Sequence, residues 1–160
     1  MKNKKLVSLL SLVLVVMFAV TGLGAIRIGR FNKDFDELWP LKVSFGDSRE
    51  KVEEVYGDDC EVMPALNDED ERTVMIYETS DGEELIIRLD DDALSSIRLT
   101  ADFLTESSLA TLEKNFGKAD EVYKDLDMWC WRGKVHGEKC LMWFSYDPVD
   151  KDYSLSFEVA

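Results

Sequence analysis

The sequence predicts an α+β fold of two tandem repeats that follow an N-terminal hydrophobic helix. Each repeat is expected to be one helix and a three-stranded antiparallel meander, with the helices on one face of the sheet. Each half holds a short amphipathic stretch that ends at a glycine, followed by alternating apolar stretches. An offset of 60 residues aligns Ser48 with Ser108, Val52 with Leu112, Glu53 with Glu113, Tyr56 with Phe116 and Gly57 with Gly117. Such a fixed internal period is typical of duplicated supersecondary units.

The N-terminus predicts a signal peptide or a membrane anchor over residues 1–26. Three lysines precede an uncharged run at 6–26, and Arg27 and Arg30 follow it. A run of about 21 residues is long for a cleavable signal and just long enough to span a bilayer, so both interpretations stay open. Positive charge upstream places the N-terminus in the cytoplasm and the rest outside. We therefore expect an extracytoplasmic bacterial protein, either membrane-anchored or secreted.

Charge divides the remaining chain unevenly. We expect a connector at 27–39, a first repeat at 40–100 and a second repeat at 101–160. Residues 34–100 hold 21 acidic and 6 basic side chains, whereas residues 101–160 hold 12 and 7. This acidity argues against nucleic-acid binding, which needs basic patches, and favours either a basic partner or simple solubility outside the cell. Membrane contact is expected only through the N-terminal segment, if it is uncleaved.

Two helices are expected, each capped at its start and stopped by glycine. Asp47 or Ser48 can cap the first helix, and the segment 105–108 can cap the second. Gly57 and Gly117 can take the backbone conformation that ends a helix. The apolar stripes are Val52, Val55 and Tyr56 in the first helix and Leu109, Leu112 and Phe116 in the second. Both helices are too short to be stable alone, so each should pack on a sheet.

Alternating or continuous apolar stretches predict the strands. Hairpin turns are expected at 80–82 and 90–92 in the first repeat, and at 133–137 and 147–150 in the second. The predicted strands are 74–78, 84–89 and 93–99, then 128–132, 139–146 and 153–159.

These residues resemble a known family. The segment 41–48 (Leu-Lys-Val-Ser-Phe-Gly-Asp-Ser), with Tyr56-Gly57 and a meander after it, is similar to the SmpA/OmlA (BamE-like) domain of bacterial envelope lipoproteins. Two such units on an exported chain resemble the architecture of β-lactamase inhibitory protein. The resemblance covers roughly residues 38–160. It implies an extracytoplasmic scaffold that binds other proteins and has no catalytic residues, although the lipid-acceptor cysteine of the lipoproteins is absent here.

Tryptophan placement predicts a partner-binding face. If Tyr146 and Tyr153 are partners across the turn before the last strand, the even-numbered residues 140–144 share the core side with the apolar row of that strand. The residues left on the open face of the sheet are then Trp129, Trp131, Trp143 and Leu141. Exposed aromatic clusters mark protein interfaces. A register shifted by one residue would place the tryptophans in the core instead, and the sequence leaves that alternative open.

The three cysteines allow one disulfide. Cys130 and Cys140 lie five residues on either side of Val135, so a hairpin turn centred on Val135 would place them opposite each other on neighbouring strands. A disulfide between them is one expectation for an exported chain, with Cys60 left over. Buried free thiols are the alternative.

An enzyme is not expected. His136 is the only histidine and lies in a predicted turn. No spaced Cys/His set could hold zinc, and the acidic runs lack the spacing of a calcium loop, so we predict no metal, no cofactor and no catalytic residue. The sequence favours a protein-binding module, with inhibition as one form of that role. The alternative is a membrane-tethered envelope assembly or structural factor that acts through its acidic first repeat.

Overall fold

The computed structural model describes residues 31–63, 72–78 and 83–160. The predicted signal or anchor at 1–26 and the predicted turn at 80–82 lie outside the described residues. Within the described ranges, no helix has both the length and the apolar character that crossing a bilayer requires.

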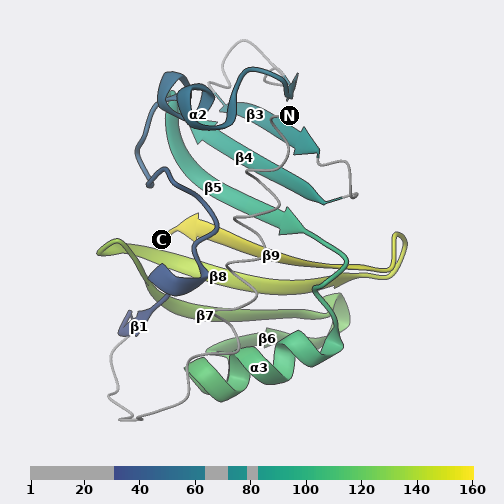
Figure 1. Cartoon of the computed structure of the whole chain (residues 1–160). Helices are drawn as coiled ribbons and strands as arrows, with labels where there is room; N and C mark the ends of the chain where they lie inside the picture. The colour runs from purple at the N-terminus through teal and green to yellow at the C-terminus, as the bar shows by residue number, and fades with distance from the viewer. Residues whose placement is uncertain (1–30, 64–71, 79–82) are drawn as a thin grey trace.

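One mixed sheet dominates the part of the chain that the structure describes (Figure 1). Its strands run in the order β1-β7-β8-β9-β5-β4-β3-β2, and β6 also pairs with β7. The strands are β1 (Lys33–Asp34), β2 (Glu61–Met63), β3 (Arg72–Glu78), β4 (Glu84–Asp90), β5 (Ala93–Thr100), β6 (Glu121–Tyr123), β7 (Met128–Val135), β8 (Glu138–Asp147) and β9 (Asp152–Val159). The helices are α2 (Arg49–Tyr56) and α3 (Glu106–Phe116), with short 3-10 turns η1 (Asp36–Leu38) and η2 (Lys124–Leu126).

The predicted architecture of two helix-plus-three-strand repeats is wrong. The strands form one sheet because β5 and β9 pair antiparallel, from Ser96 opposite Glu158 to Thr100 opposite Ser154. A short strand, β2 or β6, also follows each helix before the three long strands. Three residues are too few to show an alternating pattern, so neither strand could be predicted from periodicity. The sheet is mixed because β1 pairs parallel with β7.

The helix ends follow the local sequence signals. Ser48 accepts a hydrogen bond from the backbone of Lys51 at 3.4 Å, which satisfies one free N–H at the start of α2. Helix α3 begins at Glu106, three residues before its predicted apolar stripe, because Thr105 and Ser108 form a reciprocal capping box. Both helices stop at a glycine with positive φ, Gly57 and Gly117. The predicted caps and stops are confirmed.

The core lies on one face of the sheet, which we call the helix face. A row of directly paired side chains crosses six strands and is almost completely buried: Met75, Ile87, Ile97, Phe157, Met142 and Trp131. Val52 of α2 and Leu112 of α3 belong to the same cluster of buried residues. We call the opposite side of the sheet the outer face.

Residues 35–43, which we call the strap, fill the core between the two helices (Figure 1). This segment includes part of the stretch predicted as a connector at 27–39. Phe35 is completely buried, with its ring centre 5.2 Å from that of Phe116 and 6.2 Å from that of Phe157. The Trp39 indole donates to the Val43 carbonyl at 2.7 Å, so its one polar atom is satisfied inside the core. The strap therefore links the N-terminal edge of the sheet to α2.

Candidate binding surface

The turn between β7 and β8 decides which tryptophans are exposed. It consists of two residues, His136 and Gly137, with φ of 50° and 88°. Val135 pairs with Glu138 across this turn, whereas the predicted pairing of Cys130 with Cys140 requires a turn centred on Val135 itself. In an antiparallel hairpin, the numbers of any two paired residues add up to the same total. That total differs by three between the predicted and the observed register. An odd difference moves one strand's side chains to the other face of the sheet relative to the partner strand.

The helix face therefore receives two of the predicted binding residues. Trp129 pairs with Phe144, and Trp131 pairs with Met142. Trp131 is completely buried, and its indole N–H donates to the Gly117 carbonyl at 2.8 Å. Trp129 is partly buried against the core. Trp131 supports the end of α3 and has no surface left for a partner.

The other two predicted binding residues lie on the outer face. Trp143 pairs with Cys130, and Leu141 pairs with Arg132. Both side chains are half-buried. The Trp143 ring lies 5.9 Å from the ring of Tyr123, which is 45 % exposed. The outer face thus carries one of the three predicted tryptophans, together with a tyrosine that the sequence analysis missed.

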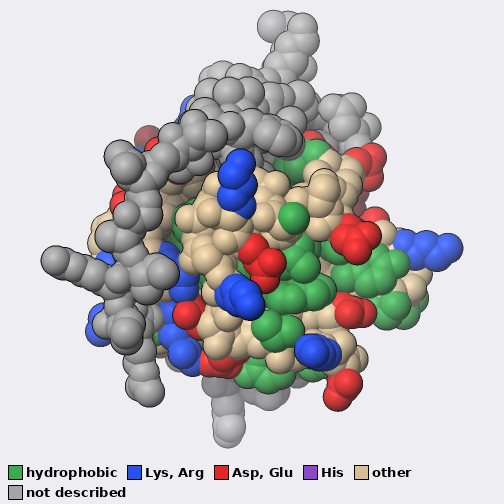
Figure 2. All heavy atoms as spheres, turned by 90° about the horizontal axis from the view of Figure 1, so that it is seen from below, with side chains coloured by type: hydrophobic (Ala, Val, Ile, Leu, Met, Phe, Trp, Pro, Cys, Tyr) green, Lys and Arg blue, Asp and Glu red, His purple; other side chains and the backbone are tan. Residues whose placement is uncertain are grey.

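Two further exposed apolar residues adjoin Tyr123 in the sequence, in β6 and η2. Val122 is 46 % exposed and Leu126 is 63 % exposed. Figure 2 views the end of the molecule formed by α3 and β6 and shows hydrophobic side chains gathered among charged ones. We call the outer-face group of Tyr123, Leu141 and Trp143 the aromatic patch, whereas Val122 pairs with Trp129 and projects to the helix-face side. Its β6 member, Tyr123, lies in a short, charge-rich stretch, 120–127, that gives no periodic signal.

Ion pairs hold the edge beside the aromatic patch. Asp120 accepts from the Lys33 ammonium at 2.6 Å and from the Arg132 backbone N–H at 2.7 Å. The Arg132 side chain pairs with Glu121. These contacts tie β6 to β7 and to β1, so the three exposed side chains of β6 and η2 project from a supported segment.

The predicted Cys130–Cys140 disulfide is not formed, and all three cysteines are free thiols. Cys130 pairs with Trp143, whereas Cys140 pairs with Gly133 and lies on the helix face. Because the two thiols point to opposite faces, they cannot approach each other. Burial raises the pKa of Cys130 to about 11 and that of Cys140 to about 12, so both are protonated at neutral pH.

His136 takes part in no catalytic arrangement among the described residues. Its Nδ1 atom lies 3.1 Å from the Ser44 hydroxyl. Asp36 accepts a hydrogen bond from the His136 backbone N–H and does not bond the ring. A serine hydrolase needs a carboxylate that orients the imidazole, and this contact does not supply it. No group of three or more His, Cys, Asp or Glu side chains within the described ranges could hold a metal ion.

Comparisons with known proteins leave the family open. No family model matches the chain, and no curated protein matches its sequence. Among solved structures, it is similar to a cysteine-rich secretory protein from Staphylococcus aureus subsp. aureus Mu50, with 13 % identity, a TM-score of 0.44 and coverage of 72 % of this chain. The chain spans 44 % of that protein's length. It is also similar to a DUF4309 family protein from Bacillus subtilis subsp. subtilis strain 168, with 13 % identity, a TM-score of 0.47 and coverage of 71 % of this chain and 78 % of that one. Neither likeness is close enough to carry an argument, and neither tests the resemblance to SmpA/OmlA domains.

Proposed function

We propose that this protein is an extracytoplasmic, non-catalytic protein-binding module that contacts its partner through the aromatic patch. The main support is Tyr123, which is 45 % exposed and whose ring lies 5.9 Å from that of Trp143 on the outer face. Contiguous exposed apolar groups with a polar rim are typical of interaction sites. Tyrosine and tryptophan supply large contact areas with little rotamer entropy to lose, and they dominate many binding surfaces.

The location outside the cytoplasm rests on the N-terminal sequence. The uncharged run at 6–26 and its basic flanks favour export or anchoring of the residues that follow. The resemblance to exported binding scaffolds points the same way. Inhibition of the bound protein is one form that this role can take.

A photo-crosslinking experiment tests the proposal. The protein is produced in its source cell with benzoylphenylalanine in place of Tyr123, and in a second strain in place of Val149. Val149 is 84 % exposed and belongs to the turn between β8 and β9, so it controls for random collisions with an exposed apolar side chain. We expect a discrete adduct with one protein from position 123 and none from position 149.

The affinity for the captured protein then measures the contribution of the patch. Trp143→Ala should weaken binding by about thirtyfold or more, the equivalent of roughly 2 kcal/mol at a hot spot. Circular dichroism should show that the variant is folded, because Trp143 lies outside the buried core. Equal adducts from both positions, or unchanged affinity in a folded Trp143→Ala variant, would refute the proposal.

A further inference from the structure

The second surface feature lies at the opposite edge of the sheet, where β2 is the last described strand. β2 pairs with β3 through Glu61 opposite Ile76, Val62 opposite Met75 and Met63 opposite Val74. No described strand pairs with the other edge of β2. An edge strand presents main-chain N–H and C=O groups that can bind another extended chain.

Two of the three side chains of β2 are apolar. All three residues are exposed, with Val62 at 37 % and Met63 at 48 %. Val62 projects to the helix-face side and Met63 to the outer-face side, since their partners Met75 and Val74 do. An added strand would therefore find an apolar side chain on both of its faces.

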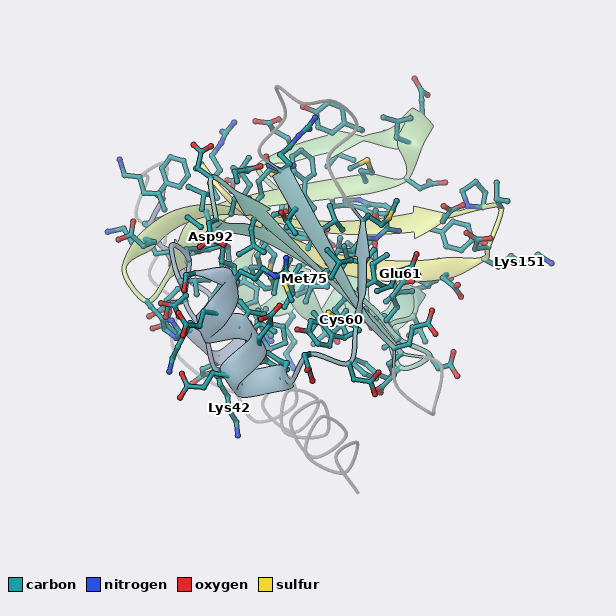
Figure 3. The ribbon with its side chains drawn as sticks, turned by 90° about the horizontal axis from the view of Figure 1, so that it is seen from above. Lys42, Cys60, Glu61, Met75, Asp92 and Lys151 are labelled. Carbon is teal, nitrogen blue, oxygen red and sulfur yellow. The ribbon has the colours of Figure 1, made fainter. Side chains whose placement is uncertain are left out.

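Acidic side chains lie in β2 and in the segment just before it. Asp58, Asp59 and Glu61 are exposed, and none of them has an ion-pair partner among the described residues. Figure 3 looks down on this end of the molecule, with Cys60 and Glu61 on the segment that follows α2. Uncompensated carboxylates beside an open edge favour a basic occupant.

A second copy of this chain does not fit the edge. Pairing β2 with β2 of another copy would bring the three carboxylates of each chain together, and like charges across neighbouring strands are destabilising. The segment 34–100 as a whole holds 21 acidic and 6 basic residues, which adds repulsion at longer range. The charge thus disfavours self-association and leaves the edge available to a chain of opposite sign.

We infer that β2 is a site of strand addition for an extended, lysine- or arginine-rich segment of another protein. Main-chain hydrogen bonds to β2 would supply affinity for any extended chain, as in other strand-addition complexes. Basic side chains of the segment would face Asp58, Asp59 and Glu61, and apolar ones would cover Val62 and Met63. This site is independent of the aromatic patch.

Binding of a defined peptide to the full-length protein tests this inference. The probe is a peptide of about ten residues with alternating lysine and valine, long enough to cover a strand. The control peptide has the same sequence with N-methylated valines, which keeps the charge and removes main-chain donors. We expect the probe to slow amide hydrogen exchange at Glu61–Met63 by about tenfold or more, and the control peptide to leave exchange unchanged.

Matched charge reversals separate a local contact from general attraction. Asp59→Lys with Glu61→Lys should weaken the probe's binding by about tenfold or more. Glu113→Lys with Asp125→Lys changes the net charge equally at exposed positions of α3 and η2, and should change Kd by less than about twofold. Trp143→Ala should leave probe binding unchanged, so a failure of the aromatic patch is distinguishable from a failure here.

Three results would overturn the inference. The N-methylated peptide could bind as tightly as the probe, which would show that main-chain pairing is absent. Both charge-reversal variants could lose affinity equally, which would show that only net charge matters. Protection of the β2 amides that rises with protein concentration, without peptide, would show that a second copy occupies the edge.

Discussion

Gly133→Ala should destabilise the protein because this glycine makes room for the strap. A β-carbon at residue 133 would lie 2.5 Å from the Lys33 carbonyl oxygen and 2.5 Å from a ring carbon of Phe35. Ordinary contacts between such atoms begin near 3.5 Å, so the strap or β7 has to move by about 1 Å. Forced overpacking of this kind costs about 1–3 kcal/mol, against which alanine regains about 0.5–1 kcal/mol of chain entropy. Because both contacts are about 1 Å too short, we expect the upper half of the overpacking range and a net loss of about 1–2.5 kcal/mol.

Urea unfolding followed by tryptophan fluorescence measures this loss as a lower midpoint with an unchanged slope. A double-mutant cycle with Phe35→Leu identifies its cause. Leucine lacks the ring carbons that the new methyl group meets, so the cost of Gly133→Ala should fall by about 1 kcal/mol in that background. The Lys33 carbonyl stays in place, and part of the cost should therefore persist.

Gly46→Ala is the matched control for the cycle. Gly46 has a φ of 85°, and a β-carbon added there would meet no atom within 4 Å, so alanine costs about 1–2 kcal/mol through backbone strain alone. It should show no coupling to Phe35→Leu. If Gly133→Ala lies within about 0.5 kcal/mol of the parent, or if Gly46→Ala couples to Phe35 as strongly, the strap does not dock on β7 as described.

Two further predictions concern the buried thiols. Alkylation by iodoacetamide near pH 8 should modify Cys60 alone, because Cys130 and Cys140 are buried and their pKa values are raised to about 11 and 12. Three adducts on the folded protein, detected by mass spectrometry, would contradict this prediction. The contribution of the two buried thiols to the free energy of unfolding should be fully present below about pH 9 and should fall as pH rises toward 12. The reason is that unfolding exposes the thiols, which then ionise at their ordinary pKa of 9.0. At the high-pH end of this range, the free energy of unfolding lost through Cys140 alone reaches about 4 kcal/mol. A urea midpoint that stays constant between about pH 8 and 11 would contradict the burial of both thiols.

Local signals predicted the helix ends and most strand positions, because each depends on a few adjacent residues. Ser48 and Gly57 bound α2, and the aspartates at 91 and 92 form the turn between β4 and β5 with positive φ, as hairpins require. The strap could not be predicted in this way. Phe35, Leu38 and Trp39 have helical spacing, but the stretch is too short for that spacing to predict an element, and their burial depends on contacts with distant strands. The same holds for β1, whose partner lies a hundred residues away.

The candidate site was partly mispredicted because one glycine was interpreted as a turn residue. Glycine is common in turns, and Gly133 with Gly137 bounded a predicted five-residue turn. In the structure Gly133 lies inside β7, where it is required by the approach of Phe35, and only His136 and Gly137 form the turn. The composition of the segment fits both interpretations, since glycine permits a turn and also permits close packing.

The consequence for function follows from the alternation of side chains in strands. Shortening the turn from five residues to two changes the pairing sum by three, and this odd change sends Trp131 to the helix face while Trp143 stays on the outer face. The two tryptophans then have separable roles. Trp131 holds the Gly117 carbonyl and contributes to folding, whereas Trp143 contacts Tyr123 at the surface. Replacing Trp131 with alanine should therefore cost about 3–5 kcal/mol of stability, as for other buried aromatic residues, and a loss of binding in that variant would report unfolding and not a contact with the partner.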